Sequence, residues 1–217
     1  MFARTTFLVF IFVTLLPLQI KAVCLDYIQE AQVFYKIPDG ILTSIGNVEA
    51  GRVMAGGKKV IWPWTVNHNG KSLFFDNKKQ YLTFLSHHKV KENIDIGCMQ
   101  ISWKWHSNQF VSIFEMGDPK KNVHYAARYL RELFSETQSW IKAVKFYHSR
   151  KKSKNEKYFQ RFSLYFSSTP KKLRKSQMPK PLFRHSITRT TTNRLSQIDY
   201  RRHQETEIIR FRNKLIS

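Results

Sequence analysis

The sequence has 217 residues, enough for one domain of ordinary size together with an additional segment. Its formal net charge is +22, and residues 151–217 alone contain 18 Lys and Arg against 4 Asp and Glu. A surface this basic favours anionic partners. The two cysteines are too few, and too far apart, for a cysteine-rich metal domain.

The first 22 residues have the pattern of a secretory signal peptide. Arg4 provides the positive start, residues 7–16 form an apolar run, and Ala22 is a small residue at the predicted cleavage site. The run is short for a membrane span, although an uncleaved N-terminal anchor is the alternative. We therefore expect export to the periplasm or out of the cell. There the anionic partners are cell-wall polymer, anionic lipid or acidic protein, and nucleic acid is not expected.

The two cysteines, Cys24 and Cys98, both lie in the part that is expected to be exported. An isolated pair in an oxidising compartment predicts a structural disulfide between them. His87 and His88 are adjacent, so on a helix their side chains diverge and do not form one metal-binding face. The sequence therefore predicts neither a metal site nor a cofactor.

An amphipathic helix is predicted at 25–36, and a second helix follows it. Pro38 suits the first turn of this second helix, and Gly51 suits a left-handed cap just past its end. Its apolar residues recur at helical spacing and predict one buried stripe: Ile41, Leu42, Ile45 and Val48. Glu49 lies on the edge of that stripe, so the periodicity alone allows a partly buried carboxylate or a solvated one.

The next segment, 58–75, has strand-like residues, and Asn69-Gly70 marks the tip of a β-hairpin. Asp76 or Asn77 is expected to cap a helix. Residues 94–102 follow neither period, and their central Gly, Cys, Met and Gln suggest close packing against another element. Further helices are predicted at 110–116, after Asp118-Pro119 and after Ser139.

The composition changes after His148. Residues 158–166 predict one more amphipathic helix, and from 167 the chain is rich in Ser, Thr, Pro, Lys and Arg. The expected organisation is a signal peptide at 1–22, a domain at 23–166, and a disordered or loosely docked basic tail at 167–217. The predicted fold class is mainly α, an α+β domain with one small β-hairpin.

Several catalytic chemistries find no support in the sequence. No glycine-rich loop follows a strand to hold phosphate, and no serine lies in a nucleophile elbow. Paired cysteines do not act as nucleophiles. Acid–base catalysis by a partly buried carboxylate remains, and Glu49 is the candidate. The surrounding aromatic and amide side chains suit carbohydrate, because rings stack on sugar faces and amides bind hydroxyl and N-acetyl groups.

Four motifs carry a family resemblance. They are Ile-Pro-x-x-Ile-Leu-x-x-Ile-x-x-x-Glu at 37–49, WPWTVN at 62–67, IDIGCMQI at 94–101 with His106, and Asp118-Pro119 with NVxYAA at 122–127 and the run 140–149. With these motifs, residues 37–148 resemble the lytic transglycosylase domain of the soluble, lysozyme-like (SLT) kind, which is also similar to goose-type lysozyme. The resemblance covers about half of the chain.

The resemblance implies a peptidoglycan lytic transglycosylase, a murein lyase of the bacterial cell wall. Glu49 would be the single general acid and base, cleaving the β-1,4 bond between N-acetylmuramic acid and N-acetylglucosamine to give a 1,6-anhydro product. The alternatives are a hydrolytic muramidase of the same fold and a non-catalytic wall-binding assembly factor. Asp95 and Asp76 are the nearest candidates for a second carboxylate, and we interpret Asp95 as a structural turn or cap residue.

The resemblance also assigns substrate-binding roles to Met99, Gln100 and Tyr147. Each has a structural alternative: Met99 as core filler, Gln100 as a loop amide with its bonds satisfied, and Tyr147 as a core aromatic. Ala50 stands where the family usually has Ser, so one hydroxyl contact is missing.

The expected partners are peptidoglycan glycan strands and, by analogy alone, a secretion or flagellar apparatus. We expect a monomer whose basic tail contacts anionic wall polymer or a membrane surface. A solvated tail without a role is the alternative.

Overall fold

The structure, a computed structural model, describes residues 23–89 and 92–168. The predicted signal peptide at 1–22 and the basic tail, apart from its first two residues, lie outside the described residues. Those two assignments stay predictions. Among the helices within the described ranges, none combines the length and the apolar character that a membrane span requires.

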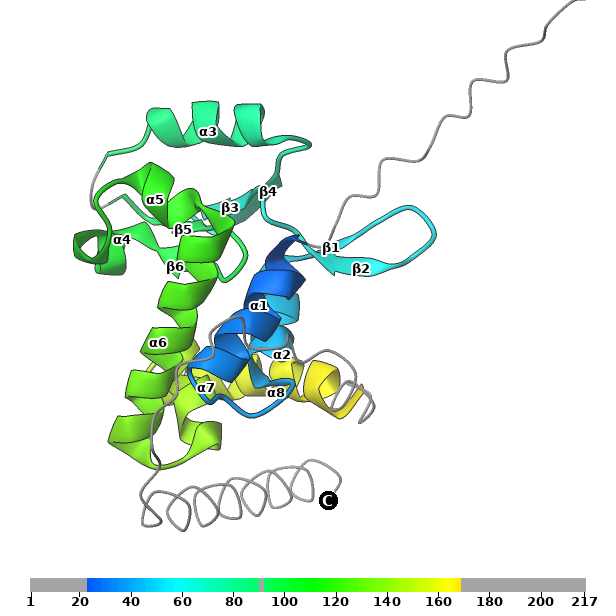
Figure 1. The fold of residues 1–217 in the computed structure, drawn as a ribbon, viewed down its shortest axis with the longest axis vertical. Coiled ribbons are helices and arrows are strands. Elements are labelled where there is room, and N and C mark those ends of the chain that lie inside the picture. Colours follow the sequence, from blue (N-terminus) through cyan, green and yellow to red (C-terminus); the bar gives the residue numbers. More distant parts are fainter. Residues whose placement is uncertain (1–22, 90–91, 169–217) are drawn as a thin grey trace, which may run out of the picture.

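The described chain is a mainly helical α+β domain, which confirms the predicted fold class (Figure 1). The helices are α1 (Val23–Phe34), α2 (Ile41–Ala50), α3 (Lys78–Ser86), α4 (Trp103–His106), α5 (Ile113–Gly117), α6 (Pro119–Thr137), α7 (Trp140–His148) and α8 (Lys152–Ser168), with a 3-10 turn at Ser107–Gln109. The strands are β1 (Gly51–Val53), β2 (Lys59–Ile61), β3 (Thr65–His68), β4 (Lys71–Phe74), β5 (Ile94–Ile96) and β6 (Ile101–Ser102).

The strands form two antiparallel sheets. One is the ribbon β1-β2, and the other has the order β4-β3-β5-β6. The sequence predicted only the β3-β4 hairpin, whose tip residues Asn69 and Gly70 both have positive φ, as an Asn-Gly turn requires. The other strands have two or three residues each, too short for a period-two pattern to mark them.

Helix α2 lies at the centre of the helical part, packed against α1 and α8. Its predicted stripe is buried at Ile41, Leu42 and Ile45. Gly46 lets its neighbours approach, because a Cβ there would lie 2.9 Å from Ile61 of β2. Figure 1 shows α8 crossing below α1 and α2. The last turn of α2, which carries Glu49, is thus enclosed by packed elements.

Both ends of α2 differ from the prediction. The helix begins at Ile41, after the left-handed Gly40, so Pro38 precedes it. Its free N–H groups are instead met by buried Gln32 of α1, whose Oε1 accepts from Leu42 N at 3.1 Å.

At the other end, Gly51 is extended, with φ −70°, because the chain passes directly into β1 and pairs with Ile61. The predicted left-handed cap at Gly51 is therefore wrong. A glycine is still required there, since a Cβ would lie 2.4 Å from the carbonyl oxygen of Asn47.

Three of the other predicted helix starts are capped by the side chains that the sequence pointed to. Asn77, Asp118 and Ser139 accept from backbone N–H groups three residues later, at the starts of α3, α6 and α7. Pro119 occupies the first turn of α6, as its sequence position predicted.

The predicted disulfide between Cys24 and Cys98 is present and fully buried. It joins the start of α1 to the turn between β5 and β6. Closing a loop with a sequence separation of 74 residues stabilises the fold by about 2–5 kcal/mol. It also ties α1 to the turn that holds Met99 and Gln100.

Candidate active site

Glu49 is half-buried in the last turn of α2. Burial raises the pKa of its carboxyl to about 7, and the negative charge of Asp95 adds to this. The side chains of Tyr158 and Arg161 act in the opposite direction and lower the pKa. The carboxyl is therefore close to half-protonated at neutral pH, the state that suits a group which first donates and then accepts a proton.

Tyr158 of α8 was not predicted as a site residue. Its side chain is buried, and its hydroxyl makes no hydrogen bond of ordinary geometry within the described residues. The hydroxyl faces Glu49 closely enough that each group shifts the pKa of the other. In the sequence Tyr158 is spaced with Phe162 and Phe166 like a core aromatic, so nothing marked a polar role.

Asp95 lies in β5, opposite Ser102 of β6. The prediction of a turn or cap residue is therefore wrong, because Asp95 is the middle residue of a strand. The strand has only three residues, too few for an alternating apolar and polar pattern to reveal it in the sequence. Burial raises the pKa of Asp95, and a hydrogen bond with Ser102 opposes that rise. The other candidate, Asp76, is exposed and pairs with Arg52 at 3.2 Å.

The turn between β5 and β6 is held by Asn122 of α6, which is fully buried. Its Oδ1 accepts from Met99 N at 2.9 Å, and its Nδ2 donates to Ile96 O at 2.9 Å and to Met116 O at 3.0 Å. Gly97 has φ 78° and packs so closely that a Cβ would lie 3.0 Å from the Asn122 side chain. The predicted close packing of this segment is thus confirmed.

Met99 and Tyr147 meet through the backbone. The side chain of Met99 has no exposed surface, which agrees with the alternative of core filler. Its carbonyl oxygen accepts from the Tyr147 hydroxyl at 2.9 Å. Tyr147 is half-buried, and burial followed by the charge of Glu49 raises its pKa well above the usual value. Tyr147 therefore lies close enough to Glu49 for the two side chains to interact electrostatically, and the Met99 carbonyl group holds the Tyr147 hydroxyl in place.

Gln100 has a left-handed backbone, with φ 48°, which is uncommon for a residue other than glycine. Its Nε2 donates to Gly97 O at 3.0 Å and to Thr65 O at 3.4 Å. The amide nitrogen thus braces the turn against β3, as the alternative of a satisfied loop amide describes. Contact between Gln100 and a sugar stays a prediction.

Three more aromatic side chains, Tyr129, His106 and Tyr125, lie in a row that begins at Tyr147. The ring centroid of Tyr129 is 5.9 Å from that of Tyr147 and 5.0 Å from that of His106, and the Tyr125 hydroxyl lies 2.7 Å from His106 Nδ1. All four side chains are half-buried. Such a row can support flat, partly apolar ligands such as sugar rings. The sequence did not predict a role for Tyr129, because Tyr129 is not one of the buried residues that form the apolar stripe of α6.

An open hollow beside Tyr158 is lined mainly by basic groups. Its lining residues are His148, Ser153, Lys154, Lys157, Tyr158 and Arg161. The His148 ring stacks on that of Tyr158, with 4.5 Å between the centroids. This hollow therefore places positive charge beside the Glu49 site.

The fold and the site agree on one kind of chemistry. The mainly helical domain holds a carboxyl with a raised pKa at the end of a core helix, next to a small sheet, and such a carboxyl suits general acid–base catalysis.

Residues 72–164 match the model of the Transglycosylase SLT domain family. The match confirms the family resemblance for this part of the chain, which is less than half of its length. It includes Met99, Gln100, Tyr147 and Tyr158 and begins after Glu49. No curated protein and no solved structure matches the sequence.

Proposed function

We propose that this protein is a peptidoglycan lytic transglycosylase in which Glu49 is the single general acid and base. The observation that carries the proposal is the raised pKa of Glu49, about 7. Its support is Tyr147, whose own pKa is raised in part by the charge of Glu49 and which lies within the residues that match the SLT family model. A surface Glu titrates near 4.3 and would be almost fully ionised at neutral pH.

The proposed reaction has two proton transfers. Protonated Glu49 donates its proton to the glycosidic oxygen between N-acetylmuramic acid and N-acetylglucosamine, and the bond from that oxygen to C1 of the muramic residue breaks. Ionised Glu49 then removes the proton of the muramic C6 hydroxyl, whose oxygen bonds to C1. The carboxyl regains its proton, and the product is a 1,6-anhydro end.

Three neighbouring groups, together with burial, favour this cycle. Burial and the charge of Asp95 stabilise the protonated carboxyl that begins the reaction. The Tyr158 hydroxyl and the charge of Arg161 stabilise the ionised carboxylate that follows. Neither state is therefore strongly disfavoured, as a group that works in both roles requires.

Hydrolysis by a muramidase of the same fold is the second candidate. Its support is the half-buried Asp95, whose charge acts on Glu49. A pair of carboxylates can divide the work, one as acid and the other as base for a water molecule.

Mass spectrometry of the products from purified sacculi tests the proposal. An anhydro end is one water lighter than a reducing end, and we expect anhydro ends only. Reducing ends that depend on Glu49 would establish hydrolysis instead. Absence of any soluble product, with the protein folded and bound to sacculi, would favour the non-catalytic assembly factor.

The setting of the reaction is also proposed. Export places the enzyme at its polymer in the periplasm or outside the cell, and the two buried, bonded cysteines are compatible with an oxidising compartment. A monomer that serves a secretion or flagellar apparatus, with its tail on anionic polymer or membrane, completes the proposal by analogy.

A further inference from the structure

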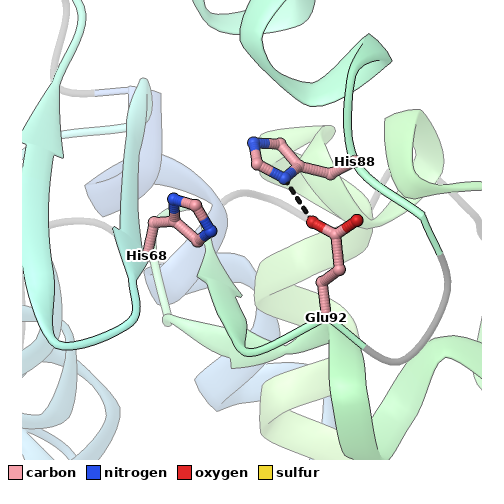
Figure 2. Close-up of side chains that lie close together, drawn as sticks. All are labelled: His68, His88 and Glu92. Carbon is pink, nitrogen blue, oxygen red and sulfur yellow. Dashed lines mark hydrogen bonds and ion pairs between the residues drawn. The ribbon is translucent and has the colours of Figure 1, made fainter.

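Three side chains from separate elements meet at one end of the larger sheet, and none of them is assigned to the Glu49 site (Figure 2). His68 ends β3, His88 follows α3, and Glu92 lies in the connection to β5. One potential ligand atom from each lies within 4.8 Å of the other two. His88 Nδ1 and Glu92 Oε2 are already 2.6 Å apart.

The group is shielded and anchored. The side chain of His88 is 10% exposed, and the Phe84 ring packs on it with 4.4 Å between centroids. The centroids of His68 and His88 are 4.8 Å apart. Glu92 Oε1 accepts from Lys89 N at 2.9 Å, which fixes the carboxylate in its orientation toward the rings. Figure 2 shows both rings and the carboxylate converging on one space.

Two imidazoles and one carboxylate are a ligand set for Zn²⁺, whose Zn–N and Zn–O distances of about 2.0–2.2 Å place tetrahedral ligand atoms roughly 3.3–3.5 Å apart. The widest of the three separations would have to shorten by about 1–1.5 Å. His88 Nδ1 and Glu92 Oε2, which are 2.6 Å apart, would have to separate by roughly 0.7–0.9 Å, and both changes are within reach of side-chain rotation. Calcium and magnesium prefer sets made of oxygen alone, so two imidazoles disfavour them.

We infer that His68, His88 and Glu92 form a binding site for one Zn²⁺ ion, with a fourth position open to water. The ion would join the end of β3 to the connection between α3 and β5. It stabilises the fold because binding requires all three elements in place. The inference does not rest on the proposed function, and no residue of the Glu49 site takes part.

Isothermal titration of the purified, tag-free full chain with ZnCl₂ is the first test. We expect one Zn²⁺ per chain, and a rise of the melting temperature by several degrees in excess zinc. The variants His68→Gln, His88→Gln and Glu92→Gln should each weaken binding at least ten-fold. His87→Gln is the matched control, because His87 is exposed and its Nδ1 lies 2.7 Å from Thr83 O on its own helix. Its affinity should equal that of the parent.

A second measurement needs no variant of the cluster and so does not depend on how a variant folds. In the parent protein, zinc should shift the histidine ring signals of two residues in NMR spectra, assigned to His68 and His88. Failure to bind Zn²⁺ at about 1 mM would overturn the inference. So would binding that shifts other histidines, or that all three cluster variants retain unchanged.

Discussion

The end of α2 and the connection between α3 and β5 each hold a half-buried glutamate, yet the pKa values of the two carboxyls are shifted in opposite directions. Burial raises the pKa of Glu49 to about 7. The pKa of Glu92 is lowered, first by the hydrogen bond from Lys89 N and then by His88. At neutral pH, Glu49 thus exchanges a proton readily, whereas Glu92 stays ionised.

The difference lies in the donors that each site supplies. At the Glu49 site desolvation by burial is the largest influence on the carboxyl, and the Tyr158 hydroxyl and the charge of Arg161 oppose it only in part. The Glu92 site offers a backbone N–H and an imidazole at short range. A carboxyl without strong donors suits proton transfer, and one with strong donors suits an ion pair or a cation.

The largest expected effect is on turnover. Glu49→Gln keeps the shape of the side chain and removes the proton, so we expect release of soluble fragments from sacculi to fall about 10²–10⁴-fold. Glu136→Gln is the matched control, because Glu136 is exposed and pairs with Arg150 on the surface. Its rate should stay within two-fold of the parent. Equal activity of the Glu49 variant and the parent would remove Glu49 from the mechanism.

The second effect is on stability and has opposite sign at the two sites. The raised folded pKa of Glu49 contributes stability that is present below about 4.5 and is lost as the pH rises through about 7. Glu49→Gln should therefore increase the free energy of unfolding at pH 8 by about 1–3 kcal/mol, and change it little at pH 4.

For Glu92 the folded pKa is lowered, so its contribution is present above the unfolded pKa and is lost as the pH falls through the folded one. Glu92→Gln should reduce stability at neutral pH and have little effect in acid. Urea unfolding at pH 4 and pH 8 measures both variants. Changes of the same sign at pH 8 would show that the two environments do not differ as described.

The helical part was largely predictable, because it follows from local chemistry. The caps at Asn77, Asp118 and Ser139 and the stripe of α2 need only neighbours in sequence. The two ends of α2 were not predictable from local sequence. At the start, Gln32 of α1 caps the helix, and just past its end Gly51 pairs with Ile61 of β2.

The same distinction explains the candidate site. Glu49 stood out by its place beside an apolar stripe, and the family motifs pointed to Tyr147. Tyr158 and the position of Asp95 emerge only when α8 and β5 reach α2. His68 and His88 likewise come together only in the folded chain, where β3 pairs with β5. In the sequence His88 stands next to His87, and that adjacent pair predicted no metal site.

A smaller effect is expected from Tyr158→Phe. Because the Tyr158 hydroxyl lowers the pKa of Glu49, its removal should raise that pKa further and extend the acid form to higher pH. The ratio of activity at pH 8 to activity at pH 6 should increase about 2–5-fold, whatever the overall rate. Tyr165→Phe is the control on the same helix, since the Tyr165 hydroxyl contacts Lys59 instead. A ratio that changes equally in both variants would contradict the assignment of Tyr158.

The smallest expected effect belongs to Asp95→Asn, and it also separates the two reactions. Loss of the Asp95 charge should lower the pKa of Glu49, so the ratio of activity at pH 8 to activity at pH 6 should fall about 1.5–3-fold. In the lytic reaction Asp95 transfers no proton, and the rate at pH 6 should stay within ten-fold of the parent. A hydrolytic reaction with Asp95 as base would instead lose about 10²-fold or more and form reducing ends. Measuring rate and product mass on the same digest therefore shows whether the second carboxylate only tunes Glu49 or takes part in the chemistry.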